Sequence, residues 1–598
     1  MSNFMRAASG AALLAALAAC SPATDETAMT YPEAPSREGL AAGISDAGEA
    51  IWNLELLHTV ETPAGFVDPE ALWSPARERA LAQAMEAGEE VERPPSPISF
   101  ANTDLAFQGE RIVMGNWHGF NVFETDGDAA PELALSVVCP GGQGDVSIHG
   151  NLVFRSVEDN RGRVDCGAGG VEGESSPDRF RGIQIFDISD LSNPRQVAAV
   201  QTCRGSHTHT LVPDPNDPDV IYVYNSATSG VRPDTELDIC SGGEPDENPE
   251  TALYSIDIIR VPLSAPQDAA IIERPRIFAD PETGAIAGLW PGGALEGQER
   301  ETARTNHCHD ITAYPELGLA AGACSGNGII LDISDPAAPV RIAELSDPNM
   351  VYWHAAIFNN DASSVVFTDE WGGGLGARCR PEDPQTWGAN VYADFDGSTL
   401  TARGYFKIPN TQTEAENCVA HNGGLVPVPG RDIMVQGWYS GGISVIDFTD
   451  PAAPVEIGFF DRGPLDGEEL YLGGNWAAYW YNGRIYAPEI VRGLDMFRLV
   501  PSAHLTANEI AAAELVRFDA FNTQTQRRFT WPDEPVVALA YLDQLEREEA
   551  VDAGLIERLR EAVEGSRDAG LAEDLAAAQA GASGRTAERL AGIAAVLE

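Results

Sequence analysis

The sequence predicts an all-β fold, a seven-bladed β-propeller that is followed by a C-terminal helical extension. One segment recurs along the chain: it opens with Gly, continues as an alternating apolar run and ends in an Asp-containing turn. Its strong copies begin at Gly182, Gly328 and Gly442. Such a run predicts a strand with a turn at its end. The 598 residues also include 59 Gly and 40 Pro, a composition that favours many turns.

The spacing of the copies indicates the number of blades. A weaker copy begins at Gly119 and a fragment begins at Gly493. Two gaps are twice as long as one unit, and each contains a further predicted strand, Leu253–Pro262 in the first and Ala389–Asp396 in the second. Repeats of about 40 to 70 residues, each with four short strands, are typical of propeller blades.

The predicted propeller spans residues 51–503, and its last blade lacks an outer strand because helical sequence follows Val500. The stretch Trp52–Glu61 precedes the first blade and has no strand partner of its own. Proteins avoid unpaired strand edges. We therefore expect Trp52–Glu61 to close the ring by pairing beside Gly493–Val500.

The first twenty residues predict export. Arg6 precedes a short apolar stretch that ends in Leu17-Ala18-Ala19-Cys20 and is too short to span a bilayer. Small residues before a Cys resemble a bacterial lipobox, which implies that residues 1–20 are a lipoprotein signal peptide and that Cys20 is lipidated. The alternative is a chance Cys after an ordinary signal peptide. Either way, we expect an exported protein. With the lipobox, we expect a lipoprotein of the cell envelope, anchored by its lipid in the outer membrane and facing the periplasm or the cell surface.

Two segments outside the propeller differ from it in composition. Residues 21–50 are rich in Ala, Ser, Pro and acidic residues without an apolar period, which predicts a flexible tether. Residues 504–598 are predicted to be helical, because Thr506 and Glu509 fit a capping box and apolar residues recur at helical spacing further on. Beyond Ser566, where Ala, Gly and Asp dominate, we expect a frayed, solvated tail.

The net charge limits which partners we expect, and the cysteine content indicates the compartment. The net charge of −53 repels phosphate backbones, so we expect no nucleic-acid partner. Eight cysteines remain after Cys20, and an even number in an exported chain predicts disulfides. The simplest pairing joins neighbours: 139 with 166, 203 with 240, 308 with 324, and 379 with 418. Alternatively, Cys308 is a thiolate metal ligand beside two histidines.

Six of the ten histidines lie at the start of predicted innermost strands: His207, His209, His307, His309, His354 and His421. Innermost strands line the channel of a propeller, and the aligned hairpins place His209, His309, His354 and His421 at one equivalent position. Imidazole suits transition metals, so we predict a metal site, with copper favoured and zinc possible. The alternative is that each His satisfies a hydrogen bond of the channel wall. We expect the other four histidines to be structural.

Glu370 follows the second strand of the fifth predicted blade, which returns to the same end of the channel. We predict that this carboxylate acts as a catalytic base beside the histidines. The alternative, a hydrogen bond from Glu370 to the backbone of a neighbouring blade, is equally compatible with the sequence.

Two resemblances add to these predictions. The three strong copies resemble the LVIVD-repeat family of exported bacterial β-propeller lipoproteins, which implies the fold and export more than an activity. The segments SHTHT (206–210), TDEWG (368–372) and AHN (420–422) are similar to segments of the selenium-binding protein/methanethiol oxidase family. That resemblance implies a seven-bladed propeller with copper bound in its channel, at positions matching His207, His209, His354, Glu370 and His421. The Cys-rich N-terminal segment of that family is absent here, and the overall spacing differs.

Two functions from different classes follow. The first is a metalloprotein of the periplasm or cell surface, with an oxidoreductase activity on a small molecule at the channel mouth. The second is a non-enzymatic propeller that binds a protein or glycan partner. The register of the histidines favours the first, and the absence of a specific catalytic motif favours the second.

Overall fold

The computed structural model describes residues 31–68, 72, 74–87, 100–294, 300–371, 373, 376–566 and 570–597. The predicted signal peptide and Cys20 therefore lie outside the described residues. Internal contacts separate residues 1–33 from a body of residues 34–598, and the following description concerns that body. Within the described part of the chain, no helix has both the length and the apolar character needed to cross a bilayer.

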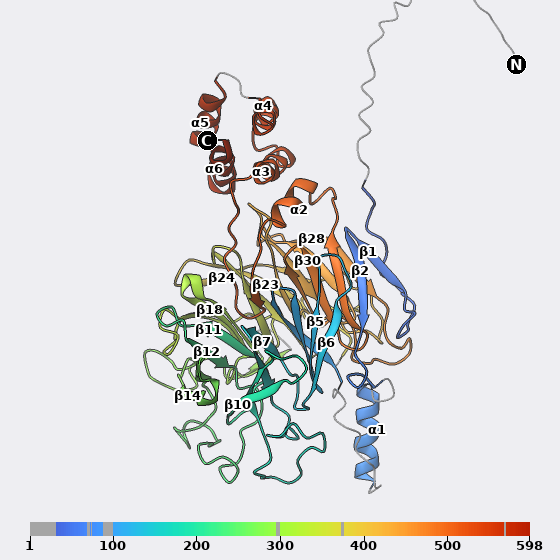
Figure 1. The fold of residues 1–598 in the computed structure, drawn as a ribbon, viewed down its shortest axis with the longest axis vertical. Coiled ribbons are helices and arrows are strands. Elements are labelled where there is room, and N and C mark those ends of the chain that lie inside the picture. The colour runs from blue at the N-terminus through green and yellow to red at the C-terminus, as the bar shows by residue number, and fades with distance from the viewer. Residues whose placement is uncertain are drawn as a thin grey trace, which may run out of the picture. The chain divides into compact units, whose positions relative to one another are not determined.

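The body has an all-β propeller fold built from small antiparallel sheets, which confirms the predicted fold class (Figure 1). Its largest sheet divides at the parallel contact between β25 (Asn422–Val426) and β29 (Ala477–Tyr481). With that division, the propeller strands form seven groups of four or five, which we number one to seven in chain order. The number of these groups agrees with the seven blades that the sequence predicts.

Group one contains β3 (Asn102–Gln108), β4 (Arg111–Asn116), β5 (Gly119–Glu124) and β6 (Glu132–Val138). Group two contains β7 (Val146–His149), β8 (Leu152–Val157), β9 (Gly182–Asp187) and β10 (Arg195–Gln201). Group three contains β11 (His209–Pro213), β12 (Val220–Asn225), β13 (Asp257–Pro262) and β14 (Ala270–Glu273). A separate pair, β15 (Gly293–Ala294) and β16 (Glu301–Thr302), and the helix α1 (Pro75–Glu86) belong to connections.

Group four contains β17 (Asp310–Tyr314), β18 (Leu319–Cys324), β19 (Asn327–Asp332) and β20 (Val340–Leu345). Group five contains β21 (Trp353–Phe358), β22 (Ser364–Asp369), β23 (Asn390–Phe395) and β24 (Leu400–Phe406). Group six contains β25, β26 (Ile433–Gly437), β27 (Ile443–Asp447) and β28 (Val455–Arg462). Group seven has β29, β30 (Arg484–Glu489) and β31 (Gly493–Leu499). Two short 3-10 turns, Pro266–Asp268 and Pro315–Leu317, lie in groups three and four.

The burial pattern changes from the first to the fourth strand of a group. Every residue of the first strands β17 and β21 is buried, whereas most residues of the fourth strands β6 and β10 are half-buried or exposed. The hydrophobic core lies between neighbouring groups: Trp353 of β21 packs on Phe367 in its own group and on the apolar face of group four. The first strands are therefore fixed on both faces, and side chains at their ends are placed rigidly.

The N-terminal strand closes the ring as predicted. β2 (Leu54–Glu61) pairs antiparallel with β31, with Leu54 opposite Leu499 and Glu61 opposite Gly493. The preceding strand β1 (Glu49–Trp52) pairs with β28 of group six, a contact that the sequence analysis did not foresee. One short N-terminal segment thus supplies outer strands to two neighbouring groups.

Leu54→Ala should lower the free energy of unfolding by about 2–5 kcal/mol, because the side chain is buried in the cluster between groups six and seven. The matched control is Leu133→Ala on β6, where the side chain is 49% exposed and removal should change stability by less than about 0.5 kcal/mol. Thermal unfolding of both variants checks this. Equal shifts of the two Tm values would contradict the closing role of β2.

The predicted tether over residues 21–50 is wrong for its last part. Arg37 is 5% exposed, pairs with Glu456 at 2.8 Å and lies over the ring of Phe459 at 3.7 Å. Segment composition did not reveal this, because the anchoring contacts are long-range: the acidic partner of Arg37 lies more than 400 residues away in the sequence, and the Gly43 N–H donates to the carbonyl of Pro464. In the described residues, the chain is packed on group six from Arg37 onward.

All four predicted disulfides are present: Cys139–Cys166, Cys203–Cys240, Cys308–Cys324 and Cys379–Cys418. The alternative of Cys308 as a thiolate ligand is therefore excluded. Disulfides form and persist in oxidising compartments, so their number indicates that the protein works outside the reducing cytosol.

The C-terminal segment closes one end of the channel. β32 (Ala520–Asn522) pairs with β3, and Asn522 bonds the backbone of Ile148 on β7. Further along, Thr525 donates to the Leu211 carbonyl of β11 and the Gln526 side chain bonds both backbone groups of Phe358 on β21. These contacts lie toward the ends of the first strands. The predicted histidines lie at their beginnings, at the opposite end of the channel.

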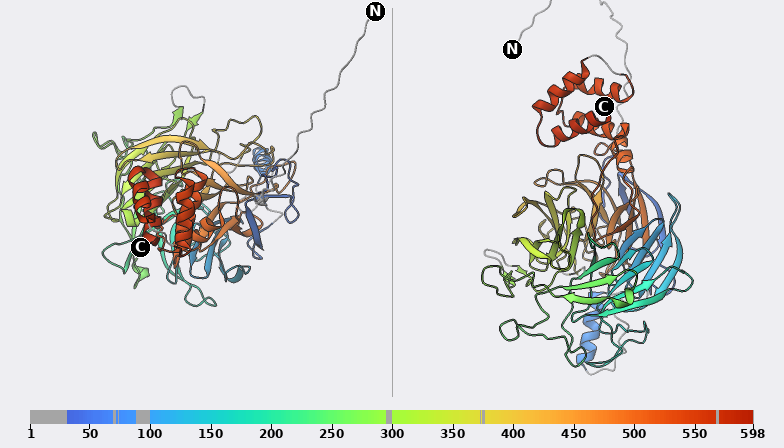
Figure 2. Two further views of the ribbon diagram at one scale, coloured as in Figure 1. Left: turned by 90° about the horizontal axis from the view of Figure 1, so that it is seen from above. Right: turned by 60° about the vertical axis from the view of Figure 1, so that its left-hand side comes forward.

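The chain ends in helices (Figure 1, Figure 2): α2 (Ala507–Ala513), α3 (Pro535–Arg547), α4 (Ala553–Val563), α5 (Leu571–Gly581) and α6 (Gly584–Leu597). Thr506 and Glu509 form the predicted capping box of α2. The expected frayed tail beyond Ser566 is wrong, because α5 and α6 bury Leu571, Leu575, Leu590 and Ile593 in a shared core with α3 and α4. These four apolar side chains pack the two helices against the others, although most residues around them in the sequence are Ala, Gly or polar.

Candidate metal centre

Four histidines from four consecutive groups form a row at the start of the first strands. His207 lies two residues before the first residue of β11, His309 and His421 directly precede β17 and β25, and His354 is the second residue of β21. The ring centroids of neighbours in the row are 4.4, 3.8 and 4.3 Å apart, from His207 through His309 and His354 to His421. We call these four residues the His cluster.

The Nε2 atoms of the His cluster turn toward a common space. The Nε2 atoms of His207 and His309 are 2.7 Å apart. Nε2 of His354 lies 3.5 Å from Oε2 of Glu370, and Nε2 of His421 lies 3.7 Å from Oε1 of the same carboxylate. Neither of these last two nitrogens has a hydrogen-bond partner among the described residues, although both are buried.

The Nδ1 atoms of the cluster are bound to protein oxygens instead. His207 donates to Glu158 at 2.7 Å and His309 donates to Asp310 at 3.0 Å. Nδ1 of His421 donates to the carbonyl of Trp476, and Nδ1 of His354 lies 3.5 Å from the Thr368 hydroxyl. Metal-binding histidines have this arrangement, in which one ring nitrogen donates to a protein acceptor and the lone pair of the other is free for the ion.

The donor set fits a transition metal. Ligand atoms of His309, His354 and Glu370 all lie within 4.8 Å of one another, so this buried triad could hold a metal ion. Two Nε2 atoms only 2.7 Å apart, with both Nδ1 atoms donating to carboxylates, share a proton; an ion bound to both at about 2.0–2.1 Å would lie to one side of the line that joins them. Imidazole with a carboxylate suits zinc, copper, iron or nickel.

Burial controls the protonation of the rings. Desolvation lowers the pKa of His309, His354 and His421 well below the usual value of an imidazole. These rings are therefore neutral at neutral pH, which is the form that binds metal. His207 differs: burial lowers its pKa, but the Glu158 carboxylate outweighs burial and the net shift is upward.

The carboxylate in the centre is also shifted. Burial raises the pKa of Glu370 to about 7, against the opposing effect of the hydrogen bond that the Tyr439 hydroxyl donates to it. Burial likewise raises the pKa of Tyr439 well above that of an ordinary phenol, so the hydroxyl stays protonated. Tyr439 thus fixes one oxygen of Glu370 and leaves the other toward His354.

Two of the six predicted histidines lie apart from the row. Nδ1 of His209 lies 2.8 Å from the Ser156 hydroxyl and 3.0 Å from an Asp145 oxygen, and the ring makes no ring contact with the cluster. In group three it is His207 that meets His309. His207 lies two residues before His209, the first residue of β11, so an alignment of the hairpins shifted by two residues exchanges them. His307 bonds Asn306, Tyr352 and Ser325 beside the row.

The other four histidines have structural surroundings that agree with the prediction. His58 bonds the Asp128 carbonyl, His118 stacks on Phe100, and His504 packs edge-on against Trp52. His149 is exposed at the far end of β7.

Sequence reasoning missed Glu158 and Tyr439. Glu158 is the first residue after β8, the second strand of group two, and Glu370 is the first residue after β22, the second strand of group five. The position that singled out Glu370 could therefore have identified Glu158 as well. Tyr439 carried no signal, because its contact with Glu370 depends on how group six packs beside group five.

The fold and this site define a β-propeller protein with a buried His/Glu centre that could hold a metal ion. The sequence model of the LVIVD repeat matches residues 323–345, which cover β19 and β20 of group four and so one strong copy of the repeat. No match is found among curated protein sequences.

Among solved structures, a periplasmic gluconolactonase from Pseudomonas aeruginosa is similar at a TM-score of 0.39 and 11% identity, over 66% of this chain and 100% of that chain. A functionally unknown protein from Desulfotomaculum acetoxidans is similar at a TM-score of 0.33 and 11% identity, over 61% of this chain and 90% of that one.

Proposed function

We propose that this protein is an exported, lipid-anchored metalloprotein that acts as an oxidoreductase on a small molecule, with its metal held by the His cluster and Glu370. One observation carries the proposal: the four rings turn Nε2 toward a common space, while each Nδ1 meets a protein oxygen. Copper is favoured and zinc is possible, since both accept imidazole and carboxylate ligands.

Bound copper would supply one-electron redox chemistry at this site, whereas bound zinc would act as a Lewis acid. The residues of the chain have separate tasks. Glu158 and Asp310 orient His207 and His309 and fix which ring nitrogen carries the proton. Glu370 lies within reach of His354 and His421 and can accept a proton from a bound small molecule, while Tyr439 holds its other oxygen in place.

The cellular part of the proposal has its own support. The four disulfides indicate an oxidising compartment, and the lipobox ending at Cys20 suits anchoring in the outer membrane. The oxidoreductase part rests on the resemblance of the segments around His207, His354 and His421 to a copper-binding propeller family. A surface protein that binds a protein or glycan partner without catalysis is the alternative.

Elemental analysis of the purified full-length protein is expected to find about one equivalent of copper or zinc per chain, since the donor set has room for one ion. Dialysis against a chelator followed by titration with each metal checks which ion is bound more tightly. Protein that contains no metal and takes up neither ion would overturn the proposed function and favour the non-enzymatic alternative.

A further inference from the structure

A cavity of about 690 Å³ lies beside the His cluster, a volume suited to a small organic ligand. Its walls come from groups one to three: Trp117 after β4, residues 158–160 after β8, residues 173–181 before β9, and residues 229–236 after β12. These segments follow second strands or precede third strands. The cavity therefore opens at the end of the channel where the His cluster lies, away from the C-terminal segment.

Glu158 connects this cavity to the His cluster. One of its oxygens accepts the hydrogen bond from His207 at 2.7 Å, and the other accepts from the Ser229 hydroxyl at 3.2 Å. Both Glu158 and Ser229 line the cavity. A ligand in the cavity would therefore lie one residue away from the first imidazole of the row.

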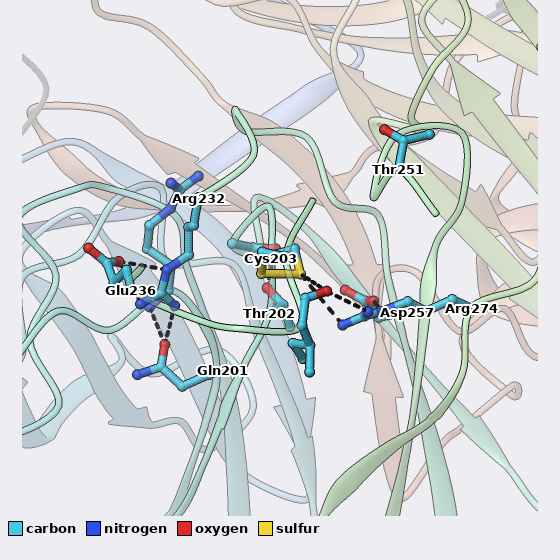
Figure 3. The surroundings of a disulfide bond; sticks show 12 residues. Gln201, Thr202, Cys203, Arg232, Glu236, Thr251, Asp257 and Arg274 are labelled. Carbon is cyan, nitrogen blue, oxygen red and sulfur yellow. Dashed lines mark hydrogen bonds and ion pairs between the residues drawn. A yellow bond between two sulfur atoms is a disulfide. The ribbon is translucent and has the colours of Figure 1, made fainter. Parts of the chain in front are cut away.

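Three guanidinium groups line the cavity, and they differ in whether a carboxylate forms an ion pair with them. Arg179 and Arg232 share the Glu236 carboxylate, and Arg232 also bonds Gln201 beside the Cys203–Cys240 disulfide (Figure 3). Arg181 has only neutral partners within hydrogen-bond distance: its terminal nitrogens donate to the Asn160 side chain at 3.1 Å and to the Gly230 carbonyl at 2.9 Å. Among the described residues, no carboxylate forms an ion pair with Arg181.

Arg155 and Arg204 are also buried with only neutral hydrogen-bond partners, but of these three arginines it is Arg181 that lines the cavity. Arg181 is 5% exposed, and burial lowers the pKa of its guanidinium to about 10. Burying a charge without a counter-charge is unfavourable, so such a group is usually retained for a partner. The net charge of −53 repels anions in general. The carboxylates of Glu158 and Glu236 line the same cavity and act on Arg181 at longer range, but neither forms an ion pair with it, so the guanidinium can still bind an anion that fits the cavity.

We propose that this cavity is the substrate pocket of the metal site and that it binds a small organic monocarboxylate, with the carboxylate against Arg181 and an apolar or aromatic body against Trp117. The inference rests on the proposed function for its link to chemistry, although the cavity itself does not depend on the metal. A single guanidinium matches one carboxylate, and the Glu158 carboxylate in the same cavity lining disfavours a second negative charge. Trp117 belongs to the lining of the cavity, and its ring packs edge-on against Trp476, with centroids 6.0 Å apart, beside His421.

Isothermal titration with benzoate tests the pocket, with benzyl alcohol as the uncharged probe of similar shape. Wild-type protein should bind benzoate and should bind benzyl alcohol at least tenfold more weakly. Arg181→Gln should weaken benzoate binding at least tenfold. The matched control is Arg195→Gln, which removes an Arg that is 62% exposed on β10 and should change the affinity less than twofold. Absence of benzoate binding to wild type, or equal effects of the two substitutions, would overturn the proposal.

A second pair of variants covers the case in which Arg181→Gln does not fold. Asn160 is exposed, and Asn160→Asp places a competing carboxylate on the Arg181 guanidinium without changing the size of the side chain. It should weaken benzoate binding at least fivefold, whereas Asn151→Asp at an exposed turn adds the same charge and should not. Equal binding by these two variants would contradict the proposal.

Metal content measured on the same samples separates this inference from the proposed function. Arg181→Gln should keep its metal while it loses benzoate, because Arg181 does not touch the His cluster. Wild-type protein that binds benzoate but takes up no copper or zinc would support the pocket and overturn the metal site. Metal-loaded protein that does not bind benzoate would support the metal site and overturn the proposed pocket.

Discussion

His354→Ala is expected to lower metal affinity by well over tenfold, so that the purified variant contains little of the metal found in wild type. His354 lies in the middle of the row, between the rings of His309 and His421, and its Nε2 atom, 3.5 Å from the Glu370 carboxylate, is buried without a hydrogen-bond partner in the described part of the chain. Even substitutions that only reorient a ligand reduce metal affinity about 10- to 100-fold, so loss of a ligand atom should exceed that range. Elemental analysis after purification measures the effect.

The matched control is His149→Ala, which removes an exposed imidazole at the other end of β7 and should leave the metal content unchanged. Both variants should keep the wild-type circular dichroism spectrum, because neither side chain anchors a hydrophobic cluster. Unchanged metal content in folded His354→Ala would count against the His cluster as the metal site.

Asp495→Ala is expected to destabilise the protein by about 3–5 kcal/mol, the range for breaking a buried ion pair. Asp495 on β31 is fully buried and receives hydrogen bonds from Arg462 of β28, Thr59 of β2 and Asn475. It therefore joins groups six and seven at the point where the N-terminal strands close the ring. Removal of the carboxylate leaves the Arg462 guanidinium buried with a less complete counter-charge, which thermal unfolding should report as a large drop in Tm.

Asp394→Ala provides the comparison, because Asp394 and Arg403 form an ion pair on the outside of group five in which both side chains are about half exposed. Exposed pairs contribute about 0–1 kcal/mol, so this variant should stay close to wild type. Similar losses in the two variants would show that the buried network is not what holds the closure together.

The ring closure illustrates how far the sequence could lead. The pairing of β2 with β31 was predictable because the strand pattern of 54–61 had no local partner and the last blade lacked an outer strand. The pairing of β1 with β28 and the anchoring of Arg37 were not predictable from composition, since both depend on residues some 400 positions away. Local patterns identify strands, whereas their long-range partners are selected by the packed body.

The same distinction holds for the channel. The sequence placed histidines at the starts of successive first strands, because the alternation of strands and turns shows where each of these strands begins. It could not decide between His207 and His209, because a shift of two residues along a strand keeps a side chain on the same face. Only the position of group four beside group three selects His207 as the neighbour of His309.

The sequence by itself determined the all-β repeat and the His-rich end of the channel, because each follows from neighbouring residues and fixed periods. It indicated local disulfides without fixing their pairing. Tertiary structure alone decided which rings converge, that Glu158 and Tyr439 join them, and that the segment after β32 closes the opposite end of the channel. These features join residues of different groups. They arise from the angle and depth at which whole sheets pack together, which no local pattern encodes.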